Sequence, residues 1–229
     1  MNKFCILLLL FLISGSMVNA QKINQFDKNG KRHGTWKKTY ENTNQVRYEG
    51  TFEHGKEVGE FKFYKPSSGA QPTAIKNFAK NNDTVAITYF TSKGKVISKG
   101  QMLHKKRTGL WTYYHQDGTS VMMKESYVDG LLEGSQITYF ENGKKTEEAN
   151  YKQNKKEGKR FVYAEKGHIL KEFTYVNDKM QGPVKFYEPD GTISIEGTYK
   201  NDKKDGLWKY YENGQLKEEK RYPLVKRKR

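Results

Sequence analysis

The chain has 229 residues but only one cysteine, Cys5, and only five prolines. A single cysteine excludes a disulfide within the chain, so stability has to come from packing and from backbone hydrogen bonds. After residue 20 the sequence also lacks any apolar run near the roughly 20 residues that a membrane-spanning helix needs. Beyond that point we therefore expect a soluble fold with no transmembrane segment.

The first 20 residues have the layout of a secretory signal peptide, which is set apart from the fold. Lys3 supplies a positive start, residues 4–13 form an apolar run, and residues 18–20 (VNA) end in the small residues of a cleavage site. We expect cleavage after Ala20 and export to the periplasm, the outer membrane or the exterior. An uncleaved anchor is disfavoured because the run is short, and a lipoprotein is disfavoured because Cys5 precedes the run.

Acidic residues are scarce relative to basic ones. The 42 Lys and Arg residues against 26 Asp and Glu residues give a net charge of +16, and removing the lysine of the signal peptide leaves 41 against 26, or +15. Such a balance favours anionic partners, although a solvated repeat surface explains it equally well. The C-terminal cluster is interpreted first as a disordered tail and second as a contact for an anionic surface. Its residues are Lys226, Arg227, Lys228 and Arg229.

Internal repetition is the strongest feature of the sequence. A glycine followed by an aromatic residue and then by tyrosine recurs every 24 or 25 residues, and one interval of 50 places a degenerate copy at Thr84. This spacing predicts about eight units. The repeat glycines are Gly34, Gly59, Gly109, Gly134, Gly158, Gly182 and Gly206.

Aromatic residues recur in phase with the repeat glycines, and we expect them to form one apolar seam through the fold. In the first unit the later aromatic slips by one place, to Tyr40, and in the degenerate unit Tyr89 is expected to take the place of Tyr64. The predicted seam consists of Trp36, Tyr40, Phe61, Tyr64, Tyr89, Trp111, Tyr114, Tyr139, Tyr163, Tyr187, Trp208 and Tyr211.

Each unit is predicted to be one β-hairpin. After a repeat glycine, five to seven residues tend to alternate toward aromatic and β-branched types, which is strand composition. An Asn-Gly or Asp-Gly pair, as at residues 213–214, then closes a tight turn. A second strand follows, and a polar turn such as residues 201–205 leads to the next glycine. Glycines this frequent would break any long helix, so the helical alternative is rejected.

The expected fold class is all-β: an elongated, twisted antiparallel sheet of tandem β-hairpins, with one aromatic-rich and one Lys/Glu-rich face. A single hairpin is marginal in water, so stacked rings should stabilise neighbouring units. A repeat glycine either adopts positive φ or lies under a ring, and the sequence leaves both open. Residues 66–83 are read as a loosened or bulged unit. The predicted parts are a signal peptide (1–20), a lead-in (21–28), the repeat domain (29–222, degenerate at 66–100) and a basic tail (223–229).

The order Gly-x-Trp-x-x-Tyr, Asn-Gly, Tyr-x-Asn/Asp, Gly resembles the MORN repeat in its bacterial variant form. Residues 205–217 (DGLWKYYENGQLK) are similar to its consensus, and the resemblance covers roughly residues 29–222. It implies a curved sheet of hairpins that serves in protein contact and, in some members, in association with anionic lipid. Such chains resemble YwqK-type antitoxins, but export fits poorly with neutralising a cytoplasmic toxin. Thr84 and Gln136 depart from the pattern, which puts the seam in question there.

No catalytic, metal or cofactor motif is found. The histidines show no metal-ligand spacing, and neighbouring carboxylates such as Glu147 and Glu148 should point to opposite faces of a strand. Nucleic acid is disfavoured because the seam already explains aromatic residues interleaved with basic ones. We expect a non-enzymatic envelope scaffold that binds protein. The alternatives are an anionic lipid or glycan surface, an antitoxin-like partner and, last, a glycan-acting enzyme. The histidines are His33, His54, His104, His115 and His168.

Overall fold

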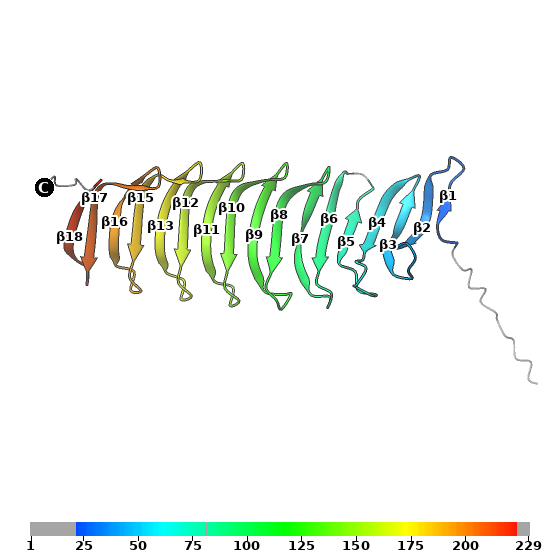
Figure 1. Ribbon diagram of the computed structural model, residues 1–229, viewed down its shortest axis with the longest axis horizontal. Helices are drawn as coiled ribbons and strands as arrows, with labels where there is room; N and C mark the ends of the chain where they lie inside the picture. The colour runs from blue at the N-terminus through cyan, green and yellow to red at the C-terminus, as the bar shows by residue number, and fades with distance from the viewer. Residues whose placement is uncertain (1–21, 81, 224–229) are drawn as a thin grey trace, which may run out of the picture.

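The computed structural model describes residues 22–80 and 82–223. Its strands form one open antiparallel sheet in which strands pair with their neighbours in the chain, apart from a break between β14 and β15, and this confirms the predicted fold class (Figure 1). Among the described residues, no helix has the length and apolarity needed to cross a bilayer. The strands are β1 (Gln25–Phe26), β2 (Arg32–Thr39), β3 (Val46–Glu53), β4 (Lys56–Phe63), β5 (Ala74–Phe78), β6 (Thr84–Phe90), β7 (Val96–Leu103), β8 (Lys106–Tyr114), β9 (Val121–Val128), β10 (Leu131–Tyr139), β11 (Lys145–Lys152), β12 (Lys155–Tyr163), β13 (Ile169–Val176), β14 (Lys179–Met180), β15 (Gly182–Tyr187), β16 (Ile193–Lys200), β17 (Lys203–Glu212) and β18 (Gln215–Tyr222).

The strands cross the long axis of the molecule in nearly the same direction from one end to the other (Figure 1). β14 and β15 both pair with β13 and together fill one strand position. The short strand β1 covers part of β2 at one end, and the charged strand β18 (QLKEEKRY) ends the sheet at the other. A short strand and a charged strand at the two edges both discourage edge-to-edge aggregation.

Two kinds of turn alternate along the chain, one at each long edge of the sheet. At the turn edge, most paired strands are joined by two residues that both have positive φ, as in Asn201 (φ +48°) and Asp202 (φ +64°). At the opposite loop edge the connections are mostly longer and end in a positive-φ glycine such as Gly143, whose N–H donates to the Phe140 carbonyl at 2.9 Å. The predicted five-residue polar turn at 201–205 is therefore wrong, because β17 already begins at Lys203.

Successive turns at the turn edge are tied to each other by paired hydrogen bonds. The backbone N–H of Asp202 donates to the Met180 carbonyl (3.1 Å), and its carboxylate accepts from the Met180 N–H (2.7 Å). Asp178 makes the same pair of bonds with Lys156, 22 residues earlier (3.0 and 2.7 Å). Each turn therefore fixes the position of the unit before it, which explains why polar residues recur there.

The repeat glycines lie inside strands, and all seven have positive φ, between +63° at Gly109 and +103° at Gly182. At Gly206 (φ +66°) a side chain would meet no atom within 4 Å, so conformation and not space favours glycine. Opposite the repeat glycine the pairing with the neighbouring strand shifts its register, as between Glu196 and Thr198 opposite Gly206, which marks a β-bulge. Positive φ is thus the correct one of the two explanations.

Aromatic rings pack instead over a second set of glycines on the neighbouring strand. A Cβ added to Gly50, Gly100 or Gly197 would lie only 2.3–2.4 Å from a ring carbon. The rings are those of Phe61, Trp111 and Trp208, each at most 1 % exposed. These three glycines are required by packing, because any side chain would displace a buried ring.

The degenerate unit is shifted by one residue relative to the prediction. Phe90 pairs with Val96 as Tyr114 pairs with Val121, so Phe90, and not Tyr89, takes the place of Tyr114. A bulge at 66–83 is wrong, since β5 pairs with β4 and β6 without any register shift. The alternative of a loosened unit agrees with the long connection at 64–73 and with the five residues of β5. This unit has no repeat glycine, and its pairing with β5 accordingly lacks the bulge found beside glycines such as Gly109 and Gly206.

Candidate binding surfaces

Strand alternation and the bulges distribute the predicted seam over two faces. Trp208 lies on one face, which we call the tryptophan face, while its neighbour Lys209 lies on the other, the Lys/Glu face. Tyr211 lies on the Lys/Glu face, because its hydroxyl donates to Glu196, the residue paired with Lys209 (2.8 Å). The expectation of a single seam is therefore wrong. Trp36, Phe61, Tyr89, Trp111 and Trp208 lie on the tryptophan face, Tyr64, Tyr114, Tyr139, Tyr163, Tyr187 and Tyr211 lie on the other, and Tyr40 follows the end of β2.

A row of neighbouring residues crosses the tryptophan face from strand to strand, and every tryptophan in it has a glycine beside it on one neighbouring strand. Trp111 lies between Gly100 and Glu125, and Trp208 between Gly197 and Lys220. The row is Trp36, Gly50, Phe61, Lys76, Ile87, Gly100, Trp111, Glu125, Gln136, Ala149, Arg160, Phe173, Val184, Gly197, Trp208 and Lys220. This arrangement lets a single layer of strands bury its indoles.

Cations cover the rings on the tryptophan face. The guanidinium carbon of Arg107 lies 4.4 Å from the Trp111 ring centroid, and Arg107 donates to the hydroxyls of Tyr113 (2.6 Å) and Tyr127 (3.0 Å). Burial raises the pKa of Tyr113 above its ordinary value. Lys204 lies in the same way over Trp208, at 4.0 Å. The side chains of these cations replace water over the rings and contribute cation–π attraction.

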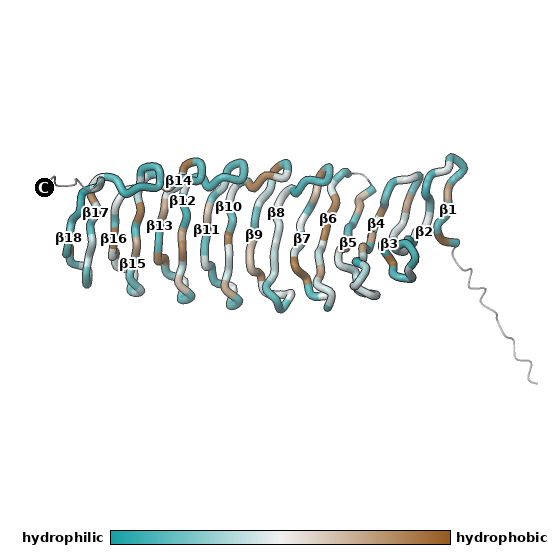
Figure 2. Tube along the Cα trace, in the orientation of Figure 1, coloured by the Kyte–Doolittle hydropathy of each residue, from teal (hydrophilic) through white to brown (hydrophobic). Residues whose placement is uncertain are grey.

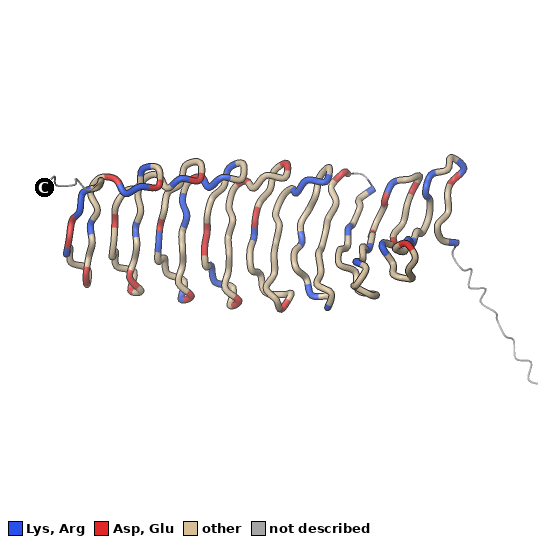
Figure 3. Tube along the Cα trace, in the orientation of Figure 1, with Lys and Arg blue, Asp and Glu red and all other residues tan. Residues whose placement is uncertain are grey.

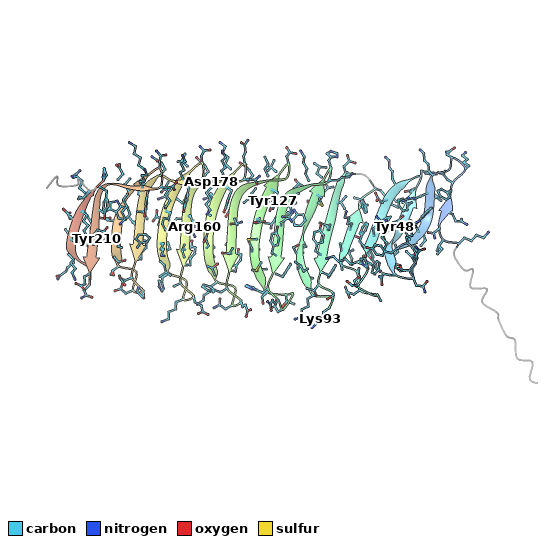
Figure 4. The ribbon with its side chains drawn as sticks, in the orientation of Figure 1. Tyr48, Lys93, Tyr127, Arg160, Asp178 and Tyr210 are labelled. Carbon is cyan, nitrogen blue, oxygen red and sulfur yellow. The ribbon has the colours of Figure 1, made fainter. Side chains whose placement is uncertain are left out.

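Polar groups replace the missing ring at Gln136, where the seam was in question. Gln136 donates to the buried carboxylate of Glu125 (2.6 Å) and accepts from the Tyr151 hydroxyl (3.2 Å). Tyr127 donates to the other oxygen of Glu125 (2.6 Å). In the next unit Arg160 binds Glu147 through two hydrogen bonds of 2.7 and 2.6 Å. The face therefore stays continuous but becomes polar between β9 and β12, in the region where Figure 4 labels Tyr127 and Arg160.

A second row crosses the Lys/Glu face, and directly paired residues form it from β2 to β18. At both ends lysine and glutamate alternate, as in Lys37, Glu49 and Lys62. The row is Lys37, Glu49, Lys62, Ile75, Thr88, Lys99, Thr112, Lys124, Ile137, Glu148, Phe161, Glu172, Lys185, Glu196, Lys209 and Glu219. We call it the Lys/Glu row.

Tyrosines lie beside the Lys/Glu row, and the kind of contact that each makes depends on whether its neighbour in the row is a glutamate or a lysine. Tyr64 donates to Glu49 at 2.6 Å, and the repeat places a tyrosine beside a row residue 15 positions earlier in most units. Near the centre that row residue is a lysine, and the contact becomes cation–π: Lys99 lies 5.5 Å from the Tyr114 ring centroid. Among the described residues neither Lys99 nor Lys124 is in an ion pair. The centre of this face is therefore positive.

The turn edge carries the most exposed pair of aliphatic side chains in the repeats. Val128 (57 % exposed) and Leu131 (40 %) face each other across the turn between β9 and β10. Figure 2 shows this apolar stretch of the edge near β9. The turns on either side present lysines, which Figure 3 shows as blue segments along the same edge. Those lysines are Lys105, Lys106, Lys152 and Lys155, all exposed.

The described residues contain no group of three His, Cys, Asp or Glu placed to hold a metal. His54 instead contacts Asp27 (2.7 Å), a hydrogen bond that lowers the pKa of this carboxyl to about 2. Glu147 and Glu148 contact groups on opposite faces, Arg160 and Tyr163, as strand alternation predicted. Sequence reasoning predicted a Lys/Glu-rich face but not which residues form its row, because the row becomes visible only once the strand register is known.

The predicted tail contact at Lys226, Arg227, Lys228 and Arg229 lies outside the described residues, as do the signal peptide and its cleavage site. Four consecutive segments, residues 132–153, 156–177, 180–201 and 204–222, match the family described as MORN repeat variant. Each match begins just after a two-residue turn, and the first three end at the first residue of the next turn. No curated protein matches the chain. The C-terminal units are thus similar to MORN-variant repeats, a similarity that suggests a scaffold or binding role.

Proposed function

We propose that the chain is an exported, non-enzymatic scaffold of the cell envelope that binds a protein partner along its turn edge. The observation that carries this proposal is the exposed pair Val128 and Leu131, held rigidly by strand pairing. Apolar side chains surrounded by polar ones mark contact sites for proteins. Turns at this edge are tied to each other, as through the bond from the Asn154 N–H to the Leu132 carbonyl (3.0 Å), so a partner meets a surface that is already ordered.

The lysines beside this pair indicate which chemical groups the partner should present. Turns of successive units lie two strands apart, about 10 Å. A partner that covers Val128 and Leu131 therefore also meets Lys106 and Lys155. We expect the partner to present an apolar side chain flanked by carboxylates, because such an arrangement complements both features.

Serine replacements test this proposal. Val128→Ser with Leu131→Ser should abolish capture of the partner by the chain cross-linked in its own envelope, because the anchoring side chains are gone. Ile97→Ser with Leu216→Ser is the matched control, since both side chains are similarly exposed (45 % and 51 %) but lie at the loop edge. Equal loss of capture in both variants, or no loss in the first, would contradict the proposal.

A second candidate function is peripheral binding to an anionic lipid or glycan surface, favoured by the exposed lysines of the turn edge. Each lysine held near an anionic surface contributes up to about 1 kcal/mol, and salt screens this attraction. Glutamine at Lys105, Lys106, Lys152 and Lys155 should then weaken co-sedimentation with phosphatidylglycerol vesicles. Glutamine at Lys65, Lys93, Lys144 and Lys166 of the loop edge makes the same change in charge and should have little effect. Binding that persists unchanged in high salt would exclude this candidate.

A further inference from the structure

The Lys/Glu row has a basic half and an acidic half. From β2 to β9 it contains four lysines and one glutamate, and from β10 to β18 four glutamates and two lysines. No element of the described chain covers this face, because the fold is a single open sheet (Figure 1). The row, with more lysine in one half and more glutamate in the other, complements its own copy when that copy is reversed. Within one chain, Glu148 and Glu172 also pair with Lys145 and Lys159, and Glu196 pairs with Lys209 of the row.

We propose that two copies of the chain associate through their Lys/Glu faces, related by a twofold axis parallel to the strands. Such an axis reverses the order of strands, so the first position of the row lies opposite the last. Lys37 then lies opposite Glu219 of the second copy, and Glu49 opposite Lys209. One further step inward, Lys62 lies opposite Glu196. The outer part of the interface therefore consists of ion pairs.

The same axis also brings a carboxylate close to the positive centre of the face. It places Glu148 opposite Thr112 of the second copy, between the two central lysines, Lys99 and Lys124. Lys99 itself lies opposite the ring of Phe161. Three of the eight opposed positions pair opposite charges, and none brings together two charges of the same sign.

The other ways of joining two faces fail on electrostatic or steric grounds. A twofold axis along the row would place every residue opposite its own counterpart, so that Lys37 would meet Lys37 and Glu219 would meet Glu219. The tryptophan faces offer no free indole surface at Trp111 or Trp208, which are 0 % exposed within one chain. The reversed arrangement of the Lys/Glu faces therefore fits best.

The face is large enough for a stable dimer. The row covers 16 strand positions, or 15 intervals of about 4.8 Å, which gives a length of about 72 Å. Six residues along each strand add a width of about 20 Å. Each copy thus presents about 1,400 Å², more than the roughly 800 Å² per partner of a standard interface. Because the strands keep nearly the same direction along the row, two reversed copies can remain in contact over most of it (Figure 1).

Charge reversal provides the test, with the full-length chain studied by sedimentation velocity over a range of concentrations. The first variant carries Lys37→Glu and Lys62→Glu, and the second carries Glu196→Lys and Glu219→Lys. Each variant alone should dimerise about tenfold or more weakly than the original chain, because like charges now face each other. An equimolar mixture should restore dimerisation, because opposite charges then meet at both ends of a mixed dimer.

The control is Lys200→Glu with Lys203→Glu, which makes the same change in charge at the turn edge and should leave dimerisation unchanged. Circular dichroism checks that each variant keeps its β-structure. Dimerisation of the original chain should also weaken as sodium chloride rises. A monomer at every concentration reached, or a mixture that stays as weak as its components, would overturn the proposal. The inference is independent of export and of any other partner.

Discussion

Replacing Gly100 by alanine should destabilise the centre of the sheet, because Trp111 occupies the space that the new methyl group needs. A Cβ at this position would lie 2.4 Å from Cδ2 of the indole and 2.5 Å from Cε2. The ring is fully buried, and its Nε1 donates to the Gln101 carbonyl at 3.0 Å. It cannot move without losing this bond. Overpacking of this kind costs about 1–3 kcal/mol, and we expect the free energy of unfolding to fall by about 2 kcal/mol.

The same substitution should be nearly harmless once the ring is removed. Phe173 and Val184 occupy the equivalent positions in a later unit, so the fold accepts a larger residue at the glycine position when its neighbour is small. In a Trp111→Val background we expect Gly100→Ala to cost less than about 0.5 kcal/mol, which leaves a coupling of about 1.5 kcal/mol between the two positions.

The original chain, the two single variants and the double variant form a double-mutant cycle. Urea unfolding followed by far-ultraviolet circular dichroism measures the free energy of unfolding of all four without relying on the fluorescence of Trp111. Hydrogen exchange over β7 and β8 checks that the loss is local. Gly109→Ala is the matched control: its cost arises from positive φ (+63°), and should therefore be the same in both backgrounds. Equal costs of Gly100→Ala with and without the indole would refute the packing argument.

Three further perturbations follow from the local geometry. Gly206→Ala should lower the free energy of unfolding by about 1–2 kcal/mol, because alanine disfavours positive φ, and Gly206→Asn should cost less; equal costs in urea unfolding would count against this. The pKa of Asp27 is lowered from 3.8 to about 2, chiefly by the hydrogen bond from His54, so this contact should stabilise the N-terminal end above about pH 4 and be lost as the pH falls toward 2. Hydrogen exchange around β1 should show that loss, and Asp27→Asn should abolish the pH dependence. Asp202→Ala should cost about 1 kcal/mol and speed exchange of the Met180 amide, whose bond it removes; unchanged exchange would mean that the turns are not tied together.

The repeat period and the hairpin fold could be predicted from the sequence, because glycine spacing and turn residues are local signals. The two functions of glycine could not, since Gly197 and Gly206 look alike until the positions of rings and bulges are known. The faces were misassigned for the same reason. Tyr210 and Tyr211 are adjacent, and the bulge between them decides which residues they contact on the neighbouring strands.

Prediction of the candidate surfaces from the sequence would have required the strand register even more. Val128 and Leu131 read as ordinary strand residues, and only the two-residue turn between them shows that they meet at an exposed edge. The Lys/Glu row links positions about 12 residues apart in sequence, and a change of one residue in any turn would move half of it to the other face. Basic residues that look scattered along the chain are therefore ordered in space.

The distance between spin labels on the Lys/Glu row tests most directly the claim that the chain is one open sheet with one strand per step. Residue 99 lies four strand positions from residue 148 and eight from residue 196. At about 4.8 Å per step, pulsed electron resonance should give distances near 19 and 38 Å when each doubly labelled chain is diluted with unlabelled chain. A second distance about twice the first is the predicted result. Two similar distances would mean that the sheet folds back on itself, and would contradict the account.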